Sequence, residues 1–261
     1  NNILKMANKA GRNGAHLGGA LSLVEVFATL FEGNYINISS NNPFDEKRDR
    51  LVISKGHCVL AYYSVLYYYG FLSKKDLDGF ETNGSVLHGH ATRDVKRGIE
   101  FSGGSLGLGL SYAIGSAINS KITNLNYHVY SIIGDGECNE GIIWESLMTA
   151  SHYKLDNLTV IVDDNKLQYD GNPKNVMNMI SFKNKFESFG FFCINIDGHN
   201  IDELCKAFEL SSNNKPKVII ANTIKGKGIS FMENQKDWHF STLSDELYEN
   251  AISEQPNLLD L

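Results

Sequence analysis

The sequence predicts an α/β protein built on a doubly wound, mostly parallel sheet with helices on both faces. Short apolar runs rich in β-branched residues recur along the 261 residues, and amphipathic segments separate them. Strands buried on both faces are apolar along their whole length, and the alternation of strands with helices is typical of parallel sheets. Since no internal repeat or flexible linker divides the chain, we expect a single domain over residues 1–261.

The candidate strands end where glycine or polar residues begin. In chain order they are Leu51–Ser54, His128–Ile133, Leu158–Asp163, Phe192–Ile196 and Val218–Thr223. The clearest amphipathic segments between them are Ser105–Ser120, Ile142–His152 and Asn178–Phe189. Ligands of doubly wound sheets bind beyond the carboxyl ends of the strands, so the residues that follow each strand are the first candidates for a site.

Composition narrows the possible partners. The formal net charge is −6, which gives no support for a nucleic-acid or membrane-surface partner. No apolar run reaches the length of a membrane span. The four cysteines form no CxxC pair, which favours free thiols in a reducing cytosol and therefore a cytoplasmic protein.

Two strand ends carry oxygen ligands. Gly134-Asp135-Gly136 follows one strand, and Asn165 follows the next one along the chain. The glycines let the backbone approach a bulky anion, and the aspartate is a hard ligand for Mg²⁺ or Ca²⁺. The spacing fits a strand end, a crossover helix and the next strand end, which predicts that Asp135 and Asn165 lie side by side. Asp163 and Asp164 suit a turn or capping role better.

Four histidines stand in glycine-containing or loop contexts: His16, His57, His90 and His239. Each alone is compatible with a structural role, but together they indicate a cluster that contacts sugar hydroxyls and moves protons. We expect His128, His152 and His199 to be structural.

Three further segments have two interpretations each. The glycines of Ser102–Gly109 suit either a ligand at a helix N-terminus or close helix packing. Lys225 and Lys227 meet either phosphate or solvent. The basic loop with Arg93, Lys96 and Arg97 is either a contact for a phosphorylated substrate or a solvated face.

The pattern from Gly134-Asp135-Gly136 to Asn165 resembles the signature of thiamine-diphosphate enzymes. The sequence between the motifs Gly14–Gly19 and Asp237–His239 is similar to that of transketolases in particular. The resemblance implies a diphosphate-binding domain of the PP type. It also implies that Asp135, Asn165 and the carbonyl of Leu167 hold Mg²⁺ (or Ca²⁺ or Mn²⁺) against the cofactor diphosphate.

The resemblance also assigns the other site residues. The residues that the resemblance implies as cofactor contacts are His57, Gly104, Leu106, Gly134, Asp135, Gly136, Glu137, Asn165, Leu167, Lys225 and His239. The residues that it implies as catalytic are His16, His57, His90, His239 and Glu140, and Glu140 would face a glutamate across the partner interface. The chain departs from the family pattern at Ala15, Gly103 and Leu108, which leaves the sugar substrate open.

Transketolases also need a glutamate that activates the aminopyrimidine ring, and in the family it belongs to a second domain. We therefore expect a split enzyme, assembled as an α₂β₂ tetramer, in which a C-terminal subunit supplies the pyrimidine-binding domain; a longer single chain is the alternative. The expected reaction is transfer of a two-carbon ketol unit from a ketose or its phosphate to an aldose or its phosphate. The other interpretations are deoxyxylulose-phosphate synthesis, 2-oxo acid decarboxylation, specialised or cell-surface sugar biosynthesis, and a non-catalytic cofactor-binding subunit.

Overall fold

The computed structural model describes residues 1–255 and contains one five-stranded, fully parallel sheet in the order β1-β2-β3-β5-β4. The strands are β1 (Arg50–Ile53), β2 (Val129–Gly134), β3 (Leu158–Asp164), β4 (Phe192–Asp197) and β5 (Lys217–Asn222). Each lies within one residue of its predicted bounds. The predicted doubly wound α/β fold is confirmed.

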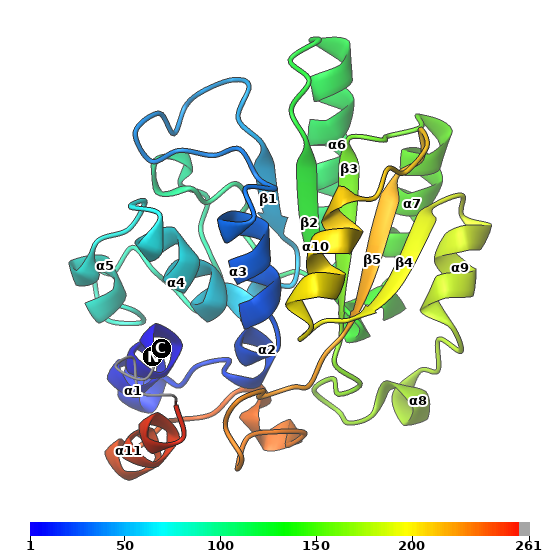
Figure 1. Ribbon diagram of the computed structural model, residues 1–261. Helices are drawn as coiled ribbons and strands as arrows, with labels where there is room; N and C mark the ends of the chain where they lie inside the picture. Colours follow the sequence, from blue (N-terminus) through cyan, green and yellow to red (C-terminus); the bar gives the residue numbers. More distant parts are fainter. Residues whose placement is uncertain (256–261) are drawn as a thin grey trace.

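Helices cover both faces of the sheet (Figure 1). On one face lie α6 (Leu108–Ile122), α7 (Gly141–His152) and α9 (Phe182–Ser188). On the other lie α3 (Val24–Glu32) and α10 (Ile201–Glu209). A hydrophobic core lies on each face of the sheet, and successive side chains of β3 point into opposite cores. Val160 and Val162 pack with α6, α7 and α9, whereas Ile161 packs with α3 and α10. This alternation between two apolar layers explains why the centre of β3 is a continuous apolar run in the sequence.

The remaining helices flank the β1 side of the sheet, apart from α8 (Figure 1). They are α1 (Asn2–Ala10), α2 (Gly18–Leu21), α4 (Val59–Tyr68), α5 (Lys74–Asp78), α8 (Pro173–Val176) and α11 (Asp245–Ser253). Helix α1 packs against α4, α5 and α11, which places the first helix beside the last helix of the described residues. Among residues 1–255 no helix combines the length and apolarity needed to cross a membrane. The four cysteines are free, as predicted.

Two predicted helices begin later than expected, and backbone geometry explains both shifts. Gly104 and Gly107 have φ of 135° and 84°, so the loop before α6 cannot be helical. Ile180 has φ of 62°, which ends any helical path from Asn178, and α9 starts after Ser181, whose side chain caps it. The third helix, α7, is confirmed nearly as predicted.

Candidate functional site

A cavity of about 420 Å³ opens at the carboxyl ends of the central strands. Residues that follow β1, β2, β3 and β5 all contribute to its lining, as expected for a doubly wound sheet. Every residue that the sequence assigned to catalysis, cofactor or metal lines this one cavity: His16, His57, His90, Gly104, Leu106, Gly134, Asp135, Gly136, Glu137, Glu140, Asn165, Leu167, Lys225 and His239. The structure therefore brings together residues from positions 16 to 239.

Asp135 presents an unused carboxylate oxygen to the cavity. It follows β2 directly, and its Oδ1 accepts a hydrogen bond of 2.7 Å from the amide of Gly136. Its Oδ2 is buried and has no partner within the described residues. Burial, helped by the nearby Asp163 carboxylate, raises the pKa of Asp135 to about 6. A buried carboxylate oxygen without a donor is the arrangement that a hard cation would satisfy.

The other predicted metal ligands follow β3. The amide of Asn165 donates to Asp163 at 3.1 Å, which fixes the orientation of the side chain. Its oxygen accepts from the amide of Leu167 at 3.1 Å, and the carbonyl of Leu167 accepts from Lys225 Nζ at 2.8 Å. Within residues 1–255 no cluster of three or more His, Cys, Asp or Glu side chains suits a metal. A site with one carboxylate, one amide and one carbonyl agrees with that result and leaves room for phosphate oxygens and water.

A buried ion pair lies beneath these groups. Lys55 follows β1 and donates to Asp163 Oδ2, and both side chains are almost fully buried. Burial alone would raise the pKa of Asp163, but the Lys55 ammonium and hydrogen bonds from Ser22 and Thr223 outweigh it and keep the pKa below its usual value. The turn or cap role predicted for Asp163 and Asp164 is therefore wrong, because both are residues of β3. Asp163 connects β3 to β1 and to the loop after β5, and Asp164 pairs with Lys166.

Replacing Lys55 by methionine is expected to lower the free energy of unfolding by about 3–5 kcal/mol, because the buried Asp163 carboxylate loses its counter-charge. Lys227→Met is the matched control, since Lys227 and Glu233 form a partly exposed pair whose loss costs about 0–1 kcal/mol. Urea unfolding measures both changes. Equal losses in the two variants would show that the Lys55 pair does not anchor the site.

The four predicted histidines form one cluster. Ring centroids lie 5.8 Å apart for His16 and His57, 5.2 Å for His16 and His90, and 5.5 Å for His16 and His239. The His57 and His239 rings lie 4.9 Å apart. A two-way backbone bridge between Ala15 and Ser241, at 2.9 and 3.0 Å, aligns the segments of His16 and His239. This bridge explains how residues from the two ends of the chain meet in one cavity.

Burial keeps three of these rings neutral. It lowers the pKa of His16 to about 4, with His90 and the lysines of the site adding to the effect. It lowers the pKa of His239 to about 3, with Lys225 as the next cause, and the pKa of His57 falls well below its ordinary value. A neutral imidazole offers one donor and one acceptor, which suits contacts with hydroxyl groups and proton movement. The Nδ1 atom of His16 is buried without a partner in the described residues.

The stability of the protein should fall as the pH decreases from 6.5 to about 4, partly through His16. The unfolded chain protonates His16 near its ordinary pKa of 6.5, whereas the folded protein does so only near 4. Between these values the unfolded chain binds more protons, and a single such group contributes about 1.4 kcal/mol per pH unit. His16→Gln should show a correspondingly smaller slope in urea unfolding across this range; an unchanged slope would contradict the neutral-ring account.

Glu137 organises the loops around the cavity. Its carboxylate accepts from Ser54, from the amide of Gly107 at 2.7 Å and from the amide of Gly134 at 3.0 Å. It therefore connects the C-terminal ends of β1 and β2 to the glycine-rich segment Ser102–Gly109. Glu140, by contrast, is exposed at the start of α7, where the side chain is open to a second molecule. The ring of His90 lies 3.2 Å from where a Cβ on Gly104 would stand, so a side chain there would crowd the cluster.

Some predictions concerned residues that lie outside the cavity. His128 bonds Thr159 at 2.9 Å, and His199 accepts from the amide of Ile224 at 2.9 Å, so both have structural partners. Lys227 pairs with Glu233 at 3.3 Å, which leaves Lys225 as the lysine of that loop that enters the cavity.

Sequence reasoning missed several lining residues: Gly19, Lys55, Asn139, Gln168, Tyr169 and Asp170. Lys55 stands in the Ser54–His57 run, where its neighbour His57 was noticed and the lysine was not. Its nearness to one predicted site residue was the only local signal.

Comparisons with known proteins find transketolases and transketolase subunits. Residues 2–253 match the family described as "Transketolase, thiamine diphosphate binding domain". The chain is 39% identical over 241 residues to an apulose-4-phosphate transketolase subunit of Phocaeicola vulgatus, covering 92% of this chain and 85% of that protein. It is 39% identical over 241 residues to a 6-deoxy-6-sulfo-D-fructose transketolase subunit of Clostridium sp., covering 92% and 87%.

Full-length transketolases are similar over part of their length. Human transketolase is 37% identical over 240 residues, which cover 92% of this chain and 38% of the human protein. The crystal structure of transketolase from Campylobacter jejuni superimposes with a TM-score of 0.89 at 32% identity, covering 97% of this chain and 40% of that one.

Proposed function

The chain belongs to the transketolase family, and we propose that it is the diphosphate-binding subunit of a two-chain transketolase. The reaction is transfer of a two-carbon ketol unit from a ketose or ketose phosphate to an aldose or aldose phosphate. The observation that carries the proposal is the meeting of the unpartnered Asp135 Oδ2 with four histidines in one cavity at the carboxyl edge of the sheet.

The proposed metal site consists of Asp135, Asn165 and the carbonyl of Leu167, holding Mg²⁺ or a similar divalent ion. Lys225 supplies a positive charge beside it, and its burial lowers the pKa of the ammonium to about 8, so the side chain is mostly charged at neutral pH. These groups together suit a diphosphate. When bound, thiamine diphosphate supplies stabilisation of the carbanion that forms when the donor carbon–carbon bond breaks.

The histidine cluster is proposed to bind the sugar and to move its protons. Neutral His16 and His57 each present a donor and an acceptor, so they can hold hydroxyl groups of the donor and acceptor sugars. His239 is oriented by Lys225, whose Nζ lies 2.9 Å from its Nδ1. Because the Lys225 ammonium donates to Nδ1, the neutral ring of His239 carries its proton on the other nitrogen and can donate it in a hydrogen bond to a substrate oxygen. The acceptor nitrogens of His16 and His57 are proposed to take a proton from a hydroxyl as the bond breaks and to return it as the new bond forms.

The partner is proposed to be a second polypeptide that carries the pyrimidine-binding domain and its activating glutamate. Two relatives that align over most of their length are named as subunits, whereas human transketolase is matched over 38% of its length. The exposed Glu140 at the mouth of the cavity is proposed to face that partner. The substrates are proposed as a class, ketoses and aldoses or their phosphates, and Ala15, Gly103 and Leu108 are the positions where the chain departs from the family pattern.

A donor and acceptor panel tests the proposed reaction. The chain and its cognate partner, supplied with thiamine diphosphate and Mg²⁺, should transfer glycolaldehyde units from a ketose to an aldose and release the shortened aldose. Product analysis by mass spectrometry identifies the transferred fragment. Decarboxylation of a 2-oxo acid with no ketose-dependent product would contradict the assignment.

A further inference from the structure

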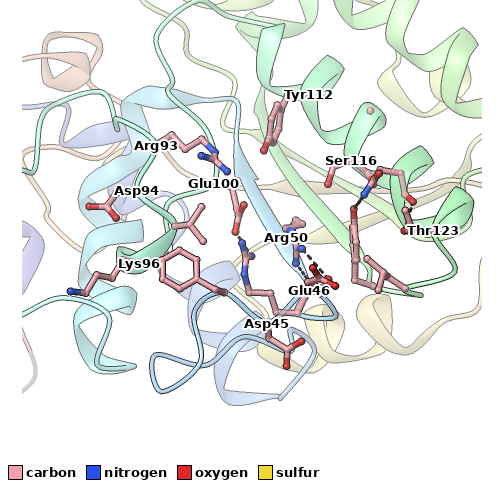
Figure 2. A pocket seen from close by; sticks show the side chains of 17 residues that line it. Asp45, Glu46, Arg50, Arg93, Asp94, Lys96, Glu100, Tyr112, Ser116 and Thr123 are labelled. Atoms are coloured by element: carbon pink, nitrogen blue, oxygen red, sulfur yellow. Dashed lines mark hydrogen bonds and ion pairs between the residues drawn. The ribbon is translucent and has the colours of Figure 1, made fainter.

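The cavity of about 420 Å³ that contains the four clustered histidines is called the histidine cavity below. A second cavity, of about 1140 Å³, shares no lining residue with it (Figure 2). It is an open groove between helix α6, the segment 44–50 that leads into β1, and the segment 93–100. Its volume is at or above the range of about 300–1,000 Å³ that is usual for small-molecule sites. The basic loop noted in the sequence forms one of its walls.

The lining contains four basic and four acidic side chains, so the charge that the groove presents to a ligand depends on which of them form ion pairs. Arg48 and Glu100 form a buried ion pair and neutralise one another. Asp94 is engaged by Arg97, which does not line the groove. Asp45 is exposed and points away from the centre (Figure 2). The carboxylates of Glu100 and Asp94 are thus compensated, whereas the exposed Glu46 beside Arg50 forms no ion pair within residues 1–255.

Arg50 is a cation held in place by ring and backbone contacts rather than by a direct ion pair. Within the described residues no carboxylate lies within 4.0 Å of its guanidinium. The group stacks 4.3 Å above the Tyr127 ring and donates to the backbone carbonyls of Arg48 and, at 3.1 Å, Glu46. Burial, followed by the neighbouring Arg48, lowers the pKa of Arg50, and the Glu100 carboxylate acts against this lowering.

Arg93 adds a second cation without a direct ion pair. Its backbone amide donates to Ser102 at 2.9 Å, and its guanidinium forms no ion pair within residues 1–255. Figure 2 shows this guanidinium reaching toward the same space as the hydroxyl groups of Tyr112 and Ser116 on α6. The Lys96 side chain extends in a different direction, away from that space (Figure 2).

We propose that this groove is a binding site for a phosphate monoester with a hydroxylated body, a ligand distinct from the cofactor. Arg50 and Arg93 would engage the phosphate, because a guanidinium presents paired donors that match phosphate oxygens. Tyr112 and Ser116 would contact the hydroxyl groups of the ligand body. The site does not depend on the proposed ketol transfer.

Calorimetric titration of the purified chain with glycerol 3-phosphate tests the site. Arg93→Gln should weaken binding at least about tenfold, because it removes a charge-assisted contact while leaving no buried group unpaired. Lys96→Gln removes the same charge from the same loop and should leave binding within about twofold. Lys225→Met should also leave the binding of glycerol 3-phosphate unchanged, because Lys225 lines the histidine cavity and not the groove.

The hydroxyl contacts have their own test. Ser116→Ala should weaken binding of glycerol 3-phosphate a few-fold without changing that of inorganic phosphate, because only the ester carries hydroxyl groups. Equal weakening by Arg93→Gln and Lys96→Gln would show diffuse attraction and overturn the proposal. Loss of binding in Lys225→Met, or no binding at all, would overturn it too. Displacement of glycerol 3-phosphate by the partner chain would mean that the groove is an interface between the two chains instead.

Discussion

Replacing Asp135 by alanine is expected to weaken binding of thiamine diphosphate and Mg²⁺ by at least about a hundredfold in the assembled enzyme. Even outer-shell partners of metal ligands commonly contribute about 10–100-fold, and Asp135 is the only carboxylate in the proposed ligand set. The variant also removes the buried oxygen that has no partner in the described chain. Titration calorimetry at fixed Mg²⁺ measures the change.

Asp164→Asn is the matched control for Asp135. Asp164 ends β3 close by, but its carboxylate pairs with Lys166 and lines a neighbouring cavity rather than the histidine cavity. The asparagine keeps the shape of the side chain, so cofactor affinity should stay within a few-fold. If Asp135→Ala binds the cofactor as tightly as Asp164→Asn does, the metal assignment fails.

Replacing His239 by alanine should lower turnover of the assembled enzyme by about 10²–10⁴-fold, the usual contribution of a general acid or base. The ring is only partly buried, and its hydrogen-bond partner among the described residues is Lys225, so the melting temperature should change little. His57→Ala should lower turnover in the same range. The two rings lie 4.9 Å apart and are proposed to act on one substrate, so the double variant should lose less than the product of the single losses.

His152→Ala is the control for the histidine variants, since His152 is exposed on α7 and lies outside the cavity. Its turnover should equal that of the unmodified enzyme. Should the His57 and His239 variants keep turnover within a few-fold while their melting temperatures fall, the cluster is structural and the proposed proton transfer is wrong.

The strands could be predicted closely from the sequence because the signal for them, a run of apolar residues, lies within each strand. Burial on both faces favours apolar runs such as Val160–Val162 in β3, and these are visible without any tertiary information. The start of α6 was placed too early because positive φ at Gly104 and Gly107 cannot be distinguished in sequence from glycines inside a helix. The candidate site residues lay after the strand ends, where the topology predicts them.

The interactions that were not predicted are long-range. Lys55 and Asp163 are 108 positions apart, and nothing near either residue indicates that they form a buried pair. The bridge between Ala15 and Ser241 likewise depends on the whole fold. The difference between Arg93, which faces the groove, and Arg97, which pairs with Asp94, is also set by side-chain direction rather than by composition.

The most direct test of the half-site proposal compares ketol transfer by the chain alone with transfer after the cognate partner is added. Thiamine diphosphate and Mg²⁺ are present throughout, and light scattering verifies which polypeptides are assembled. The chain alone should show no transfer, because no residue of its cavity is proposed to activate the aminopyrimidine ring, and the partner should restore activity and raise thermal stability by mass action. Full activity from this chain in the absence of a second polypeptide would contradict the account.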